Sequence, residues 1–118
     1  MKKVSISTTS DAPDWALLER EIIAKLNKAA PEFVKKYTNV DGTLKWKSEF
    51  GSMDGSDDPY EAFHNLALLY AIGGSEEVYD LARKMWESIT LQWTEYGQIH
   101  REFDGYYDWM HHGEGYLF

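Results

Sequence analysis

The chain has 118 residues, with 12 basic and 20 acidic side chains and a formal net charge of -8. Because such a field repels phosphate backbones and anionic lipids, we exclude nucleic acid and membrane surfaces as partners. With 43% hydrophobic residues the chain is long enough to bury one modest core, and with no cysteine it has neither disulfides nor thiolate metal sites. No apolar run approaches the roughly 20 residues of a membrane span, and no signal core follows Met1. We therefore predict a cytoplasmic protein, unless a leader has been removed.

The first long helix is predicted over residues 14–37, after a flexible lead-in at 1–13. Asp11 is its expected N-cap, and helical spacing gives it one apolar stripe. The stripe consists of Trp15, Leu18, Ile22, Leu26 and Ala29. Proline lacks the backbone N–H, so Pro31 predicts a break or kink.

Two further helices are predicted over 59–72 and 76–93. Asp58, Pro59 and Glu61 have the residue types of a helix start with a capping box. Gly73 and Gly74 end the first of these helices, and the short link forces an antiparallel hairpin. The helix at 59–72 is apolar nearly all round and is expected to be buried, whereas 76–93 has a single apolar stripe and a polar face.

A partial repeat at an offset of 47 residues indicates that the hairpin belongs to an array. Thr43-Leu44-Lys45-Trp46 recurs as Thr90-Leu91-Gln92-Trp93, and the segment 60–64 resembles 107–111. Residues 108–118 are then the start of the next inner helix. Because that helix ends without a following partner, we predict self-association through the 108–118 end. The predicted fold class is all-α, built from antiparallel helical hairpins in an incomplete array.

Long loops at 43–57 and 94–107 both run from outer to inner helices, so both are expected at the same end of the array. They and the helix that follows carry most of the unusual residues. Candidate catalytic residues are Asp54, Asp57, Glu102, Glu114, Tyr107, His111 and His112; candidate substrate-binding residues are Trp46, Trp93, His100, Arg101 and Tyr106. Flat aromatic faces beside carboxylates suit a sugar, which stacks on rings and hydrogen-bonds through its hydroxyls. Paired carboxylates are also what glycosidic hydrolysis requires. We therefore predict carbohydrate as the ligand.

Three stretches resemble the amino-terminal part of bacterial (α/α) toroid proteins, within residues 42–118. They are Gly51-Ser52-Met53-Asp54-Gly55-Ser56-Asp57-Asp58-Pro59-Tyr60-Glu61-Ala62-Phe63-His64-Asn65, Leu69-Tyr70-Ala71-Ile72-Gly73-Gly74 and His111-His112-Gly113-Glu114-Gly115. The resemblance implies the toroid architecture and the carbohydrate-active class of glycoside hydrolases and polysaccharide lyases. It identifies no single family and carries over no catalytic motif, and fold likeness does not fix function.

Hydrolysis is the first prediction, with the four candidate carboxylates, three in the loops and Glu114 on the helix that follows, as acid and base and Tyr107 as a further platform. The alternative is β-elimination on a uronate polysaccharide. There Tyr107 or His111 would abstract the proton, and Arg101 or His112 would neutralise the carboxyl group.

Each of these groups also has a structural interpretation. Trp46 and Trp93 are more often packing anchors than sugar platforms, and Asp58 and Glu61 fit helix caps. Glu61-x-x-His64 and Asp108-x-x-His111 have the spacing of carboxylate and histidine ligands in di-metal bundles, but the first long helix has no acid at the centre of its stripe. We predict no metal and no cofactor. A non-catalytic binding or interaction fragment stays a third alternative.

Overall fold

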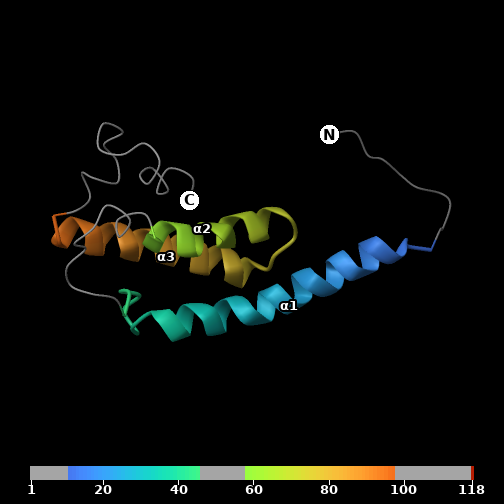
Figure 1. Cartoon of the computed structure of the whole chain (residues 1–118), viewed down its shortest axis with the longest axis horizontal. Coiled ribbons are helices and arrows are strands. Elements are labelled where there is room, and N and C mark those ends of the chain that lie inside the picture. Colours follow the sequence, from blue (N-terminus) through green and yellow to red (C-terminus); the bar gives the residue numbers. More distant parts are fainter. Residues whose placement is uncertain (1–10, 46–57, 98–117) are drawn as a thin grey trace.

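A computed structural model describes residues 11–45, 58–97 and 118 and contains three helices in these ranges (Figure 1). They are α1 (Asp14–Tyr37), α2 (Asp58–Ala71) and α3 (Glu76–Glu95). The sole extended pairing within the described part is an isolated antiparallel bridge between Thr38 and Leu44. The all-α class predicted from helical periodicity is therefore confirmed for these ranges. The predictions for 108–118 and for most of the lead-in lie outside the described residues.

Helices α2 and α3 form an antiparallel hairpin, and their facing sides make the centre of the core (Figure 1). The most deeply buried side chains include Tyr60 and Phe63 of α2 with Val78, Met85, Ile89 and Trp93 of α3. Two glycines make the corner. Gly73 has φ +117°, a left-handed conformation that favours glycine, and a Cβ on Gly74 would lie 2.8 Å from the Leu69 carbonyl oxygen. The predicted glycine corner is thus a geometric requirement of the turn.

The two helices differ in how completely they are buried. The stripe predicted for α3 is correct, because Val78, Ala82, Met85 and Ile89 are buried in the core and Leu81 is partly buried against it. The prediction that α2 is buried all round is wrong for the described structure, where Leu68 is 56% exposed. Helix α2 is covered by α3 on one side and only lightly by α1, so its remaining apolar residues have no neighbouring helix among the described elements.

Helix α1 has the predicted bounds, but two predicted details are wrong. Its N-cap is Pro13, without a side-chain cap bond, so Asp11 lies outside the helix. Pro31 does not break it: the helix continues to Tyr37. Proline can adopt helical φ, and the cost of the missing N–H is offset here because Ala30 and Val34, on either side of Pro31, are buried against the hairpin.

Only the second half of α1 packs closely on the hairpin. Asn27 ties the two together, because its side-chain oxygen accepts a hydrogen bond of 3.0 Å from the backbone N–H of Ser75 at the α3 N-terminus. The first half projects beyond the hairpin (Figure 1), and there Trp15 is 68% exposed and Leu18 59% exposed. The predicted stripe therefore exists, but most of it meets no other element in the described ranges.

The 47-residue repeat does not correspond to equivalent structure where both copies are described. Thr43 and Leu44 lie in the non-helical turn after α1, whereas Thr90 and Leu91 lie inside α3. Leu44 is buried and Leu91 is 61% exposed. The predicted second loop also begins later than expected, since Thr94 and Glu95 are still helical.

Candidate functional site

The residues nominated from sequence fall almost entirely in two segments, 46–57 and 98–117, that lie outside the described residues. This applies to every nominated carboxylate, histidine and tyrosine, to Arg101 and to Trp46. Their roles as acid, base or platform stay predictions. Trp93 alone is placed, and it is 1% exposed in the core of the α2–α3 hairpin. That burial agrees with its interpretation as a packing anchor, because a stacking platform needs an accessible ring face.

Three of the four described residues that border these segments lie at the same end of the hairpin. Residues 45, 58 and 97 follow α1, begin α2 and follow α3, respectively, and these three helix ends lie together in Figure 1. The Gln92 side chain fixes this end: its Oε1 accepts from the Leu44 N–H at 2.9 Å, and its Nε2 donates to the Leu44 carbonyl at 3.4 Å. The expectation that both loops start from the same end therefore agrees with the described anchors.

A compact turn at 38–45 completes this end. Asp41 Oδ1 accepts hydrogen bonds from the Thr43 hydroxyl at 2.7 Å and the Thr43 N–H at 2.9 Å. These bonds, the side-chain one first, lower the pKa of Asp41 below its ordinary value of 3.8. Gly42 has φ +92° and lies so close to α3 that a Cβ there would clash with the Ser88 hydroxyl. The backbone of the turn therefore packs directly against α3, and the Asp41 side chain forms hydrogen bonds within the turn.

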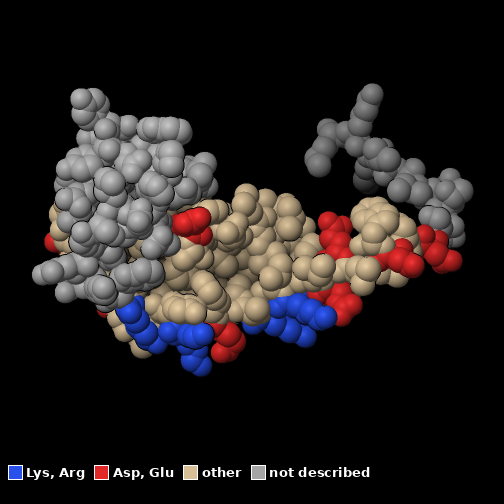
Figure 2. Space-filling view, viewed as in Figure 1, with Lys and Arg blue, Asp and Glu red and all other residues tan. Residues whose placement is uncertain are grey.

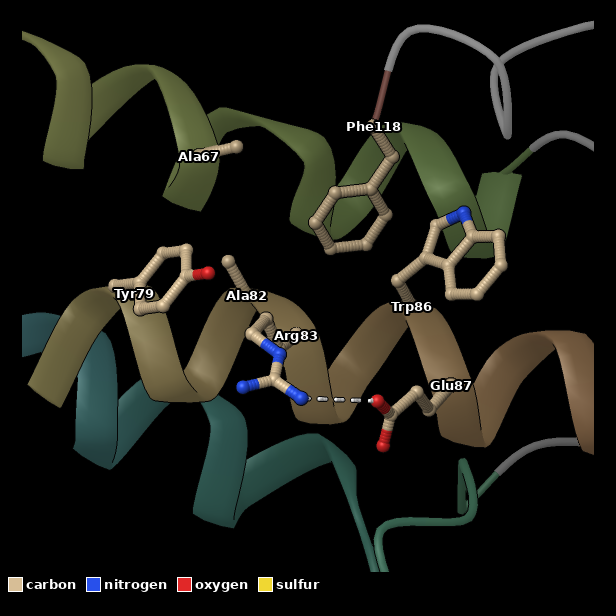
Figure 3. Close-up of a pocket in the computed structure, with 7 residues that line it drawn as sticks. All are labelled: Ala67, Tyr79, Ala82, Arg83, Trp86, Glu87 and Phe118. Carbon is tan, nitrogen blue, oxygen red and sulfur yellow. Dashed lines mark ion pairs between the residues drawn. The ribbon is translucent and has the colours of Figure 1, made fainter.

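A concavity, which we call the aromatic groove, runs between α2 and α3 (Figure 3). Its volume is about 360 Å³, and it is lined by Ala67, Tyr79, Ala82, Arg83, Trp86, Glu87 and Phe118. Tyr79 and Trp86 are 40% and 39% exposed, so each presents part of a ring to solvent. Phe118 also lines the groove, and its ring is drawn between the α2 and α3 ribbons in Figure 3. The two small residues, Ala67 and Ala82, leave the space between the rings.

Charged groups lie beside these rings. The Arg83 Nη2 is 3.6 Å from Glu87 Oε1, and the Arg83 guanidinium lies 5.9 Å from the centre of the Tyr79 ring. Both charged side chains are more than half exposed, so the pair contributes little to stability and its polar atoms are accessible to a ligand. A groove of this kind offers flat apolar faces, five guanidinium donors and two carboxylate acceptors in one place.

Sequence reasoning missed this groove, although a signal exists. The spacing of the groove residues on α3 places them on one side of the helix, beside the apolar stripe. They are Tyr79, Arg83, Trp86 and Glu87. The small residues that open the groove, Ala67 and Ala82, come from different helices, so their proximity follows only from the hairpin packing.

Two further features bear on the class of site. Among the described residues, no cluster of three or more His, Asp or Glu side chains is arranged to hold a metal ion. No described helix combines the length and the hydropathy needed to cross a bilayer.

Comparison with known proteins gives one match. The model of a protein family, described as Domain of unknown function (DUF8034), matches residues 3–118. No curated protein and no solved structure matches the chain.

Proposed function

Since the chain belongs to this family of unknown function, we propose from its site geometry that it is a carbohydrate-binding helical unit and that the aromatic groove is its binding site. The observation that carries the proposal is the proximity of two partly exposed aromatic residues, Tyr79 and Trp86, to the polar groups of Arg83 and Glu87, although one side of the Tyr79 ring packs on Tyr70. Sugars present C–H faces that stack on rings and hydroxyls that hydrogen-bond at their edges, so both halves of the groove have a matching partner in one ligand. A volume of about 360 Å³ is that of a small-ligand site.

The charge of the chain favours neutral sugars. With a net charge of -8, the protein repels a polyuronate more strongly than a neutral glycan of the same length. One arginine in the groove is already paired with Glu87 and offsets little of this field. Of the two reactions considered from the sequence, hydrolysis of a neutral glycan is therefore better supported than elimination on a uronate.

Catalysis is the finer part of the proposal. Glu102 and Glu114 belong to the segment between Gly97, which follows α3, and Phe118, which lines the aromatic groove. We propose these two carboxylates as the acid and base that act on a sugar bound in the groove, because glycosidic hydrolysis requires a pair of carboxyl groups. We also propose that the hairpin extends into a toroid array and that the protein is a glycoside hydrolase, because hydrolysis of a neutral glycan is the better supported reaction.

The binding test is a titration of the protein with neutral oligosaccharides, followed by amide and indole NMR signals. The Trp86 indole signal should move on addition of ligand, and Trp86→Ala should abolish saturable binding. Trp15→Ala is the matched control, because Trp15 is exposed on the projecting half of α1, far along the chain from the groove. Equal losses from both variants, or no saturable shift with any neutral sugar, would contradict the proposal.

The reaction test compares products. A hydrolase releases new reducing ends without ultraviolet absorbance, whereas a lyase produces an unsaturated uronate that absorbs. If hydrolysis occurs, Glu102→Gln and Glu114→Gln should lower turnover about a hundredfold or more, because a positioned acid or base contributes at least that much to rate. Binding without turnover would leave the sugar-binding unit and remove its catalytic assignment.

A non-catalytic interaction unit is the second candidate, and one observation favours it. The stripe on α1 is large, apolar and exposed, and surfaces of that kind mark contacts with other proteins.

A further inference from the structure

The exposed side of α1 continues into a second groove of the molecule, between α1 and α2. Along α1, the stripe residues Trp15, Leu18, Ile22 and Leu26 are between 43% and 68% exposed. Leu26 then forms one wall of an apolar concavity of about 270 Å³. The remaining walls are Ala29, Ala30, Phe33, Ala62, Asn65, Leu66 and Leu69. Stripe and groove together form one surface, which we call the α1 face.

The spacing of the α1 face is regular. Its residues are spaced three, four, four, three and four positions apart, which is the pattern of an 11-residue helical repeat. They are Trp15, Leu18, Ile22, Leu26, Ala29 and Phe33. Such a repeat keeps one straight side of a helix apolar over its whole length. The side that packs on the hairpin is a different one, made by Ile23, Asn27 and Val34, with Ala30 at the border between the two sides. Helix α1 therefore has one side used within the chain and a second side left for another helix.

We propose that the occupant of the α1 face is a second copy of this chain, bound with its own α1 antiparallel about a two-fold axis at Ile22. An axis at this residue pairs each position with the one at the same distance on its other side. Leu18 then faces Leu26 of the partner, and Trp15 faces the partner's Ala29. The largest side chain of the stripe thus meets its smallest, at the mouth of the apolar groove between α1 and α2.

The size of the groove fits this arrangement. Ala29, Ala30 and Ala62 leave it open, and its volume of about 270 Å³ exceeds the roughly 150 Å³ that accommodates a benzene ring in a protein cavity. A two-ring indole is therefore a suitable occupant. In the isolated chain Trp15 is 68% exposed, so insertion into the partner's groove would remove a large apolar area from water.

The charges along α1 select the antiparallel orientation. Residues 14–24 contain three carboxylates and one arginine, whereas residues 25–37 contain four lysines and one carboxylate. Figure 2 shows acidic side chains gathered where α1 begins and basic ones along the lower edge of the molecule. Antiparallel pairing brings Asp14 near Lys28 of the partner and Glu21 near Lys25 of the partner. Parallel pairing would bring like charges together, so the charge pattern favours a second copy in the antiparallel orientation.

The main test measures association of the full chain by sedimentation over a wide concentration range. A dimer that dissociates on dilution is expected, and Ile22→Glu should weaken it by roughly a hundredfold, because two carboxylates would meet at an apolar axis. Leu91→Glu is the matched control: Leu91 is 61% exposed on α3, away from the α1 face. A monomer at every concentration, or equal weakening by both variants, would overturn the proposal.

A charge exchange tests the orientation. Asp14→Lys and Lys28→Asp should each weaken the dimer by roughly threefold to tenfold, since an exposed pair is replaced by like charges at two symmetric places. The double variant should restore association. Residues 14 and 28 are about 21 Å apart along one helix, too far to interact within one chain, so rescue can come only from the partner. Weakening without rescue would overturn the antiparallel arrangement.

A cross-link locates the axis. The chain has no cysteine, so Ile22→Cys introduces a single thiol. Under mild oxidation with diamide, two such thiols at the axis should form a disulfide-linked dimer, because this bond requires Cα atoms within about 7 Å. Leu17→Cys should not cross-link, since Leu17 is exposed on another side of α1. Equal cross-linking at both positions would indicate random collision and overturn the axis. Occupation by another segment of the same chain would appear as a monomer with no cross-link.

Discussion

The α2–α3 hairpin and the first half of α1 are both amphipathic helical structure, yet only the hairpin has its apolar residues covered. In α3 the stripe residues Val78, Met85 and Ile89 are at most 1% exposed, whereas in α1 Trp15 and Ile22 are 68% and 57% exposed. Helical periodicity is the same kind of signal in both. It therefore predicts that a helix has an apolar side, but it does not say whether the same chain covers that side.

The largest expected difference between the regions is the cost of truncating an apolar side chain. Met85→Ala should lower the free energy of unfolding by about 2–5 kcal/mol, because Met85 is fully buried and its removal leaves a cavity. Leu17→Ala, on the exposed part of α1, should change it by less than about 0.5 kcal/mol. Urea denaturation of both variants measures the difference. Similar costs would show that the α1 half is packed as tightly as the hairpin.

The next effect concerns the contact between the hairpin and the turn that follows α1. Gln92→Ala should cost about 2–3 kcal/mol, because the buried N–H and C=O of Leu44 would lose their side-chain partner. Gln92→Met, which keeps the volume but not the hydrogen bonds, should cost almost as much. If the methionine variant is as stable as the original chain, the contribution of Gln92 is packing.

Replacing Pro31 should stabilise the second half of α1. Pro31→Ala restores a backbone hydrogen bond inside α1 and should stabilise the chain by at most about 2 kcal/mol, since alanine is the better helix former but gains freedom in the unfolded state. Thermal unfolding with circular dichroism measures the gain. Pro59→Ala, at the second position of α2, is the control and should give no such gain, because proline is favoured in the first turn. A loss of stability in Pro31→Ala would mean that the proline ring makes a needed contact.

The smallest effect is pH-dependent and lies in the turn between the regions. Thr43 lowers the pKa of Asp41, so the charged form is favoured in the folded state. Its stabilisation is fully present above the ordinary pKa of 3.8 and is lost as the pH falls through the lower folded-state value. The stability difference between the original chain and Asp41→Ala should therefore shrink in acid. Asp80→Ala, on the exposed face of α3, is the control, and an equal response in both variants would contradict the assignment.

Much of the local structure follows from the sequence, because it depends on neighbours within a few residues. The bounds of α1, the Gly73-Gly74 corner and the α3 stripe are examples. The errors involve tertiary context. The burial of Ala30 and Val34 offsets the cost of a continuous helix across Pro31. The exposure of Leu68 depends on which helices are present to cover α2. A local pattern contains neither fact.

The candidate site was less predictable for the same reason. The aromatic groove needs Ala67 of α2 and Ala82 of α3 to face each other, and no spacing within one helix reports on that. The residues nominated for catalysis were chosen by chemical type, from loops rich in carboxylates and rings. Trp93 shows the limit of that approach, because its residue type fits a platform while its burial fits the core.

The two hydrogen bonds that hold α1 in place also set an order of events during synthesis. Asn27 bonds to Ser75 and Leu44 bonds to Gln92, and each contact joins residues 48 positions apart. Helix α1 leaves the ribosome before the hairpin but cannot dock until α2 and α3 have followed, because its hydrogen-bond partners lie in the later part of the chain. A nascent α1 thus spends the longest time with both of its apolar sides exposed. Neighbouring chains on one polysome, or a chaperone, would meet this helix before its own hairpin does.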